Sequence, residues 1–486
     1  MKLAFPALRR AFGALSLVAF LPCAASATTH WAKLAPSDGQ QFDTFGLAVA
    51  IDGDTIIVSK GTVIPQSGPG WLYAFTRSGG KWTQAQKFQP SGIQAGEWFG
   101  ALDLEGTTLV ASSAPQLNTL GSNAASAYVF EKTGSTWAGT QKLVPSDPGA
   151  QDDFGSWIAV SGTTLVVGAA RKADQGLGAG AVYVFEKGGT GWTQTQKLVA
   201  TDGTQGAMFG TCVDIEGSTI VVGAPGDPSH GNFTGAVYVF QKQSGTWNQT
   251  QKLVAGDAAT NQFLGDRVAL SGTSLVASAW GNATQGNTSG AVYAWESASG
   301  TFNQIQKIIP ADTGAQDRFG AALALGSGTL VVGAVGDDDR GANTGAAYVF
   351  TKPGATWTQL KKLTASDSTT DEDYAGAVAT NGNWMVVAAD ANGLGLVGAA
   401  YLYGKTDADG DGYPVEVDCL DTNANVNPGK TEVPNNGLDD DCNAATPDTT
   451  GCGSVAGGTT ASAAGALPFG LVGLALVALR RRWSRT

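Results

Sequence analysis

The segment HWAKLAPSDG, residues 30–39, opens the polar body of the chain, yet close copies of it later end a longer unit. The copies are STWAGTQKLVPSD at 135–147, GWTQTQKLVATD at 191–202 and TWNQTQKLVAGD at 246–257. The body therefore begins with the last part of its own repeat. This offset in phase predicts how the fold closes.

An aromatic residue next to a glycine marks the start of each repeat unit. The successive aromatic residues lie 54, 55, 55, 54, 56 and 55 positions apart, which defines seven units of nearly constant length. They are Phe45, Phe99, Phe154, Phe209, Phe263, Phe319 and a degenerate Tyr374.

Each of the first six units contains four short runs with the composition of β-strands. In the third unit they are FGSWIAVSG (154–162), TTLVVGAA (163–170), AGAVYVFEK (179–187) and WTQTQKLV (192–199). Glycine-containing turns separate the runs, and no stretch has a helical pattern. The hairpin turn between the first two runs places glycine where a two-residue turn needs a positive φ. We expect four antiparallel strands per unit.

A single four-stranded sheet cannot bury both of its faces, whereas seven sheets packed radially can, so the sequence predicts an all-β, seven-bladed β-propeller. The Trp and Phe residues fill the spaces between sheets, and small residues such as Gly168, Gly223 and Gly333 allow close approach. The seventh unit ends at VGAAYLYGKT (397–406), after its third strand. We predict that the N-terminal strand supplies the missing fourth strand and closes the ring.

Both ends of the chain carry transport signals. Residues 1–27 have a basic start, an apolar stretch and an Ala-Ser-Ala cleavage site, typical of a signal peptide. Residues 461–479 are uncharged and mostly apolar, and Arg480, Arg481, Arg482 and Arg485 follow, which predicts a membrane segment with a cytoplasmic end (461–486). The body between them has a net charge of −19, which disfavours nucleic acid and anionic lipid as partners.

The Phe-Gly pairs and the VVGAP stretch (221–225) resemble FG-GAP repeats, the units of the integrin α-chain propeller. The resemblance covers residues 31–404 and implies a propeller domain, which we place at 28–404. Integrin-like units often hold calcium in an Asp-rich loop between their first two strands. Here that turn has two to four residues, too few for such a cage, so no calcium is expected in the blades. The tract GDDDRG (336–341), with Asp337, Asp338 and Asp339, is interpreted as a solvated acidic loop.

After the propeller, DADGDGYPVEVDC (407–419) has the spacing of an EF-hand loop. Asp407, Asp409 and Asp411 stand at positions 1, 3 and 5, the carbonyl of Tyr413 at position 7, and Asp418 at position 12. Alternating carboxylates on a loop bent at a glycine supply the six to eight oxygens that Ca²⁺ prefers.

A second acidic cluster completes a predicted calcium-binding module at 405–446. Its candidate ligands are Asp421, Asn423, Asn425, Asp439 and Asp441. The stretch 407–442 resembles the Asp-rich MopE and thrombospondin type 3 modules of surface proteins. Copper would require nitrogen or sulfur ligands, and the only two histidines, His30 and His230, lie outside the module, so calcium is the expected metal.

The five cysteines have separate expected roles. Cys419 and Cys442 bracket the acidic module, and in an exported chain we predict that they form a disulfide. Cys212 stands alone in a strand and is expected to be a buried apolar residue. Cys452 lies in a Gly/Thr/Ala-rich linker (447–460) before the membrane segment, an arrangement that resembles MYXO-CTERM sorting signals. That resemblance implies processing near Cys452; a retained membrane anchor is the alternative.

No catalytic motif is apparent, and GLGLVG (393–398) precedes a strand where a dinucleotide-binding fingerprint would link strand to helix. Three functions remain open. The first is a surface-anchored propeller that binds an extracellular protein or glycan; the second is a structural envelope protein; the third is a carboxylate-based carbohydrate-active enzyme. We favour binding, because the loops between the second and third strands vary and should share one face with the loops before each Phe-Gly.

Overall fold

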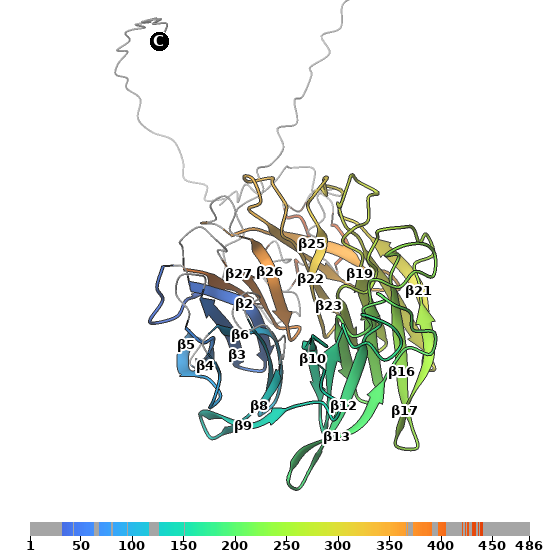
Figure 1. Ribbon diagram of the computed structural model, residues 1–486. Coiled ribbons are helices and arrows are strands. Elements are labelled where there is room, and N and C mark those ends of the chain that lie inside the picture. Colours follow the sequence, from blue (N-terminus) through green and yellow to red (C-terminus); the bar gives the residue numbers. More distant parts are fainter. Residues whose placement is uncertain are drawn as a thin grey trace, which may run out of the picture.

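The computed structural model describes two parts of the chain. The first is residues 32–404, except 42, 63–67, 79–80, 95, 116–125, 150, 366, 368–372 and 391–396. The second is residues 420, 423, 425–426, 430–433, 436 and 438–440. The first part forms seven four-stranded antiparallel sheets arranged in a ring, with β2 of the first sheet beside β26 and β27 of the last (Figure 1). The predicted seven-bladed propeller is confirmed.

Each sheet runs from an innermost strand at the axis to an outermost strand at the rim. In this order the strands are β2 Asp43–Asp52, β3 Thr55–Thr62, β4 Trp71–Ser78 and β5 Lys81–Phe88 in blade 1; β6 Glu97–Glu105, β7 Thr108–Pro115, β8 Ser126–Thr133 and β9 Thr136–Leu143 in blade 2; β10 Phe154–Ser161, β11 Thr164–Ala169, β12 Ala181–Gly188 and β13 Gly191–Leu198 in blade 3; β14 Val213–Glu216, β15 Thr219–Ala224, β16 Ala236–Gln243 and β17 Thr246–Leu253 in blade 4; β18 Val268–Ser271, β19 Ser274–Ser278, β20 Val292–Ala298 and β21 Thr301–Ile308 in blade 5; β22 Phe319–Gly326, β23 Thr329–Ala334, β24 Ala346–Thr351 and β25 Thr358–Leu363 in blade 6; and β26 Tyr374–Thr380, β27 Trp384–Ala389, β28 Ala399–Gly404 and β1 Ala32–Leu34 in blade 7.

The ring is closed by the N-terminal strand, as the repeat phase predicts. Strand β1 pairs antiparallel with β28, and Lys33 lies opposite Tyr401. The side chain of Leu34 is buried in the core between blades 7 and 1. The last blade is thus built from both ends of the propeller domain.

A hydrogen-bonded group of three side chains, which we call the seam triad, joins most neighbouring blades. An Asp that follows the outermost strand of one blade binds a Tyr and a Lys of the next; Asp147, for example, accepts hydrogen bonds from Tyr183 Oη at 2.7 Å and Lys197 Nζ at 2.7 Å. The other complete triads are Asp38–Tyr73–Lys87, Asp202–Tyr238–Lys252, Asp257–Tyr293–Lys307 and Asp367–Tyr401–Lys33. The N-terminal segment therefore supplies Lys33 to one triad and Asp38 to another.

The glycines of the second strands permit backbone-to-backbone contact between blades. A Cβ atom placed on Gly168 would lie 2.0 Å from the carbonyl oxygen of Gly210, and one on Gly223 would lie 1.9 Å from that of Gly265. Gly333 meets Ala375 in the same way. Since real Cβ atoms do not approach oxygen so closely, only glycine fits, and the predicted close approach is confirmed.

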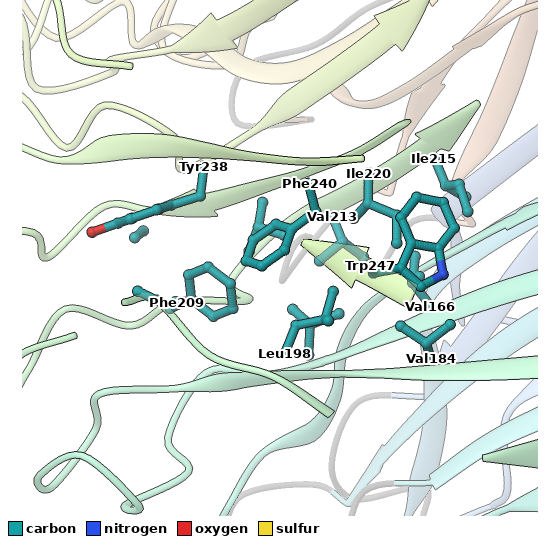
Figure 2. Packing of buried hydrophobic residues seen from close by; sticks show 14 of the residues in the cluster. Val166, Val184, Leu198, Phe209, Val213, Ile215, Ile220, Tyr238, Phe240 and Trp247 are labelled. Atoms are coloured by element: carbon teal, nitrogen blue, oxygen red, sulfur yellow. The ribbon is translucent and has the colours of Figure 1, made fainter. Parts of the chain in front are cut away.

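Buried aromatic and β-branched residues fill the spaces between sheets. Between blades 3 and 4, Phe209 meets Tyr238 edge to face at a centroid distance of 5.3 Å. Figure 2 shows this cluster, with Val166, Val184 and Leu198 from blade 3 and Phe209, Val213, Ile215, Ile220, Tyr238, Phe240 and Trp247 from blade 4. Cys212 is fully buried in the neighbouring cluster, as expected, and burial raises the pKa of its thiol to about 12.

The landmark residue predicted for the fifth unit is wrong by one position. Leu264, not Phe263, is fully buried and pairs with Gly235, as Phe209 pairs with Gly180 and Phe319 with Gly290. Phe263 is only partly buried. With Leu264 as the landmark, the spacings on either side become 55 and 55. The phenylalanine at 263 was mistaken for the landmark, because in this unit a leucine occupies the buried site that an aromatic residue fills in the others.

Among the described residues, no helix is long and apolar enough to span a bilayer. The predicted signal peptide (1–27), linker (447–460) and membrane segment (461–486) lie outside the described residues.

Replacement of Gly223 by Ala should destabilise the propeller by roughly 1–3 kcal/mol, since the added methyl group overpacks a backbone contact. Gly100→Ala is the matched control: its Cβ would meet nothing within 4 Å, and Gly100 is absent from the positive-φ glycines. Its effect should stay within about 0.5 kcal/mol. Urea unfolding followed by tryptophan fluorescence measures both, and equal losses of stability would contradict the packing argument.

Candidate functional site

The loops between second and third strands and the loops that precede the innermost strands lie together on one face of the ring. In blades 3 to 6 this face, which we call the loop face, comprises residues 170–180, 203–208, 225–235, 258–263, 280–290, 313–318 and 335–345. Backbone hydrogen bonds join the two kinds of loop across each seam, for example Phe263 N–H to Phe233 O at 2.9 Å and Gln316 N–H to Asn287 O at 2.8 Å. The predicted sharing of one face is confirmed.

Buried ion pairs lie where the first and second strands of a blade meet the loops. Lys172 contacts Asp152 at 2.9 Å, and Lys60 contacts Asp43 at 2.6 Å, all four side chains being largely buried. In blade 4, Asp227 is 1% exposed and accepts hydrogen bonds from Tyr238 and Lys252. Burial raises the pKa of Asp227, but the bonds from Ser229, Lys252 and Tyr238 outweigh it and lower the pKa below its ordinary value. The Asp227 carboxylate therefore stays ionised and holds its loop in place.

The prediction that the GDDDRG tract is a solvated acidic loop is wrong for Asp337. This side chain is 1% exposed, and it binds Tyr348 Oη at 2.9 Å and Lys362 Nζ at 2.6 Å. Asp339 also pairs with Lys362. The charge of Lys362 compensates both carboxylates, so the tract is a structural ion network at the base of the loop face.

The side chains that the loop face presents differ from blade to blade over this shared frame. Blade 3 presents Arg171 and Leu177, blade 4 His230 and Phe233, blade 5 Trp280. Blade 6 presents Asp338 and Arg340. A face of constant backbone geometry and varied chemistry is suited to recognition.

The axis of the ring contains a channel of about 540 Å³ lined by the innermost strands. Two aspartates, Asp103 and Asp214, occupy a position that is alanine in the other blades. These alanines are Ala50, Ala159, Ala269, Ala324 and Ala379. The two carboxylates are the part of the site that sequence reasoning missed; the alternation of Asp with Ala at this position was the available signal.

Both carboxylate oxygens of each channel aspartate accept a hydrogen bond from a backbone N–H group. Asp103 accepts from Val160 N–H at 2.7 Å and Leu104 N–H at 2.9 Å. Asp214 accepts from Leu270 N–H at 2.7 Å and Ile215 N–H at 2.8 Å. One bond in each pair crosses to the next blade, so these carboxylates join blades.

The channel also changes the acidity of these groups. Burial, with smaller contributions from the charges of Glu105 and Asp52, raises the pKa of Asp103 to about 6 despite its two amide bonds. Burial raises the pKa of Asp214 to about 8, with a further contribution from the charge of Asp103 and a smaller one from that of Glu216. At neutral pH Asp214 is mainly protonated.

Most of the predicted metal ligands lie outside the described residues. These are Asp407, Asp409, Asp411, Tyr413, Asp418, Asp421 and Asp441, together with Cys419, Cys442 and the sorting residue Cys452. Of the described ones, Asn423 Oδ1 accepts a hydrogen bond from Asn425 N–H at 3.3 Å, and Asp439 is partly buried. Within the residues that the structure describes, no three carboxylate, His or Cys side chains form a metal cluster.

The described part of the module nevertheless contains a carboxylate pair: Asp440, which belongs to the second acidic cluster of the sequence, and Glu432, which was not among the predicted ligands. Asp440 is 6% exposed and accepts hydrogen bonds from Val433 N–H and Asn436 Nδ2, while Glu432 Oε2 accepts from Asp440 N–H at 3.0 Å. Glu432 Oε1 is buried and has no hydrogen-bond partner in this part of the chain. A buried carboxylate oxygen without a donor fits a hard cation such as Ca²⁺. The signal was the Glu between the NPG and NNG stretches.

The FG-GAP repeat model matches residues 28–75, 137–185, 192–240, 247–295, 302–350 and 357–403, more than half of the chain, and the chain belongs to this family. Each matched segment runs from the outermost strand of one blade to the third strand of the next. The family unit thus has the same phase as the N-terminus of the domain.

A second family, the Cu-binding MopE type of metal-binding motif, matches residues 418–446. The chain therefore carries a metal-binding motif after the propeller. The matched segment includes Glu432 and Asp440.

Among solved structures, two of Sqt1 from Chaetomium thermophilum are similar, each at 13% identity. One has a TM-score of 0.42 and covers 74% of this chain and 82% of that chain; the other has 0.43, with 77% and 89%. Scores below 0.5 carry no argument about function. No curated protein matches the chain.

The raised pKa values predict that the propeller becomes less stable as the pH rises from about 5 to about 8. Over this window the folded chain keeps protons on Asp103 and Asp214 that the unfolded chain, with a pKa near 3.8, has lost. The free energy of unfolding therefore falls, by at most about 1.4 kcal/mol per pH unit for each group. Urea unfolding at several pH values measures the slope.

Asp214→Ala should flatten this pH dependence, because it installs the residue found at the same position in five other blades. Asp54→Ala, at an exposed carboxylate paired with Arg77, should keep the wild-type slope. Identical slopes for wild type and Asp214→Ala would show that the channel aspartate is not the titrating group.

Proposed function

We propose that this protein is an exported, surface-anchored propeller that binds an extracellular protein or glycan through its loop face, and that Ca²⁺ orders its C-terminal module. The protein acts by binding and not by catalysis. The observation that carries the proposal is the contrast between the seams, which repeat the same contacts, and the loop face, which carries different side chains in each blade.

The way the channel carboxylates are bonded supports binding without catalysis. Asp103 and Asp214 have perturbed pKa values in a cavity, which is a common feature of catalytic acids. Their oxygens, however, are held by backbone amides of two blades. Their arrangement is accounted for by blade cohesion.

The location of the protein is inferred from several features together. FG-GAP repeats and MopE-type motifs indicate an extracellular or surface protein. The leader at 1–27 and the apolar segment at 461–486 support export followed by anchoring, with Cys452 as the sorting residue. The acidic body favours solubility and cation binding.

Calcium is proposed as the metal because the module offers oxygen ligands. The candidate set is rich in carboxylates and amide carbonyls, and Glu432 adds a buried oxygen that lacks a donor. When bound, Ca²⁺ would neutralise the clustered carboxylates and order a segment with little apolar core. Glu432 and Asp440 hold the chain that carries the later ligands.

Isothermal titration of the full chain with CaCl2 tests this assignment. Glu432→Gln should weaken calcium binding by about tenfold, since it removes a charged ligand from the module. Asp54→Asn, which removes an exposed charge from a blade, should leave the affinity unchanged. Unchanged affinity in Glu432→Gln would contradict the role of Glu432.

Glycan arrays and a cell-surface pull-down with the full chain, in calcium and in EGTA, test the binding function. A partner retained in both conditions supports binding by the loop face, since calcium is placed in the module and not in the blades. Absence of any retained protein or glycan in both conditions would favour a structural envelope role, and turnover of a polysaccharide would overturn the assignment as a non-enzyme.

A further inference from the structure

Three aromatic side chains stack on the loop face at the junction of blades 4 and 5. The rings of Phe233 and Phe263 have centroids 5.4 Å apart at an interplanar angle of 29°, and those of Phe263 and Trp280 are 4.7 Å apart at 8°. Phe263 is therefore the middle of the stack. Phe233 is 43% exposed and forms an end of the stack that solvent reaches.

The repeat provides an internal comparison that isolates this stack. The position of Phe233 is Gly178, Thr288 and Asn343 in blades 3, 5 and 6. The position of Phe263 is Asp153, Met208, Arg318 and Asp373 at other seams, and that of Trp280 is Ala170, Pro225 and Val335. The same fold is thus built without aromatic residues at these places, so the propeller frame does not require the stack.

The backbone also disfavours two of these aromatic residues. Phe233 and Phe263 have φ values of 53° and 57°, in the left-handed region where glycine or asparagine costs least. The frame imposes this conformation, as Thr288 (φ 53°) and Arg318 (φ 54°) show. An aromatic side chain there adds cost without filling a core, which indicates a role at the surface.

The exposed parts of the loops that carry the stack have no ionic residue, since Asp227 of the blade 4 loop is buried. Residues 229–235, 258–265 and 279–290 contain no Asp, Glu, Lys or Arg, although the neighbouring blades carry charged residues in the same loops. The same segments expose amide and hydroxyl side chains instead: Asn232, Thr260, Asn261, Thr284, Gln285 and Asn287. Of these, Thr284 accepts a hydrogen bond from Lys307 Nζ at 2.8 Å. These groups donate and accept hydrogen bonds without an ionic preference.

We propose that the stack is a binding platform for the pyranose rings of a neutral glycan, a proposal that rests on the proposed binding function. An apolar face of C–H bonds packs against the exposed ring of Phe233, while the surrounding amides and hydroxyls bind the sugar hydroxyls. The −19 charge of the body disfavours polyanions that also stack on aromatic rings, such as single-stranded nucleic acid. Phe263 and Trp280 hold Phe233 in place.

An array of neutral oligosaccharides, including cellohexaose, mannohexaose, chitohexaose and maltohexaose, tests the platform with the full chain. At least one should bind, and Phe233→Ala should weaken its binding by about tenfold or more, whereas Phe233→Trp should retain it. Leu177→Ala is the matched control, because Leu177 is 74% exposed on the same face of blade 3 but lies outside the stack. Its affinity should equal that of the wild type.

The remaining outcomes overturn the proposal in distinguishable ways. Failure of all neutral glycans to bind, or equal loss in Phe233→Ala and Leu177→Ala, contradicts the platform. Binding of proline-rich peptides in place of glycans, lost in Phe233→Ala, replaces the ligand class. If wild type and Phe233→Ala retain the same partner equally in the pull-down, the proposed binding function stands, but the aromatic stack takes no part in it.

Discussion

The pairing of β1 with β28 is the contact on which the rest of the structure depends. Without β1, blade 7 would have only three strands and nothing would tie the two ends of the domain together; here three residues from the N-terminal segment complete that blade. The same segment continues into blade 1, where Ser37 bonds to Gln84 and Asp38 bonds to Tyr73. The closing seam is therefore made of the same contacts as the continuous ones.

The seams show how much of the repeat is needed for packing. Between blades 1 and 2, Gly92 stands where the other seams have the triad Asp. Lys142 Nζ still lies over the ring of Tyr128, 5.4 Å from its centroid. Gly100 lies in open space, unlike the equivalent Gly210 and Gly265. The FG-GAP repeat model leaves out this unit, residues 76–136, although the structure builds a regular blade there. The seam between blades 5 and 6 also lacks a complete triad, because Asp312 bonds to Lys362 while Tyr348 bonds to Asp337. Blade formation thus tolerates an incomplete triad at two seams and the loss of one close backbone contact.

The sequence was sufficient to predict the blade number, the closure and the close glycine contacts, because each follows from repetition. It was insufficient where two residues can satisfy the same site. Leu264 fills the pocket of a landmark phenylalanine, so letters alone placed the landmark at Phe263. Asp337 was taken for a solvated charge because its ion-pair partner, Lys362, lies 25 positions later in the sequence, on another strand. Asp103 and Asp214 were missed because nothing within their own repeat units marks a channel; only a comparison of this position across the units, Asp in two and Ala in five, would have singled them out.

The proposed binding function also depends on the pairing of β1 with β28, since the loop face exists only when the blades are held in a ring. Native-state hydrogen exchange of the full chain, read in peptides covering residues 32–38 and 399–404, tests that closure most directly. The account predicts that the two segments exchange with similar protection, because β1 opens only when blade 7 opens. Exchange of residues 32–38 at the rate of an unstructured peptide, while residues 399–404 stay protected, would contradict it.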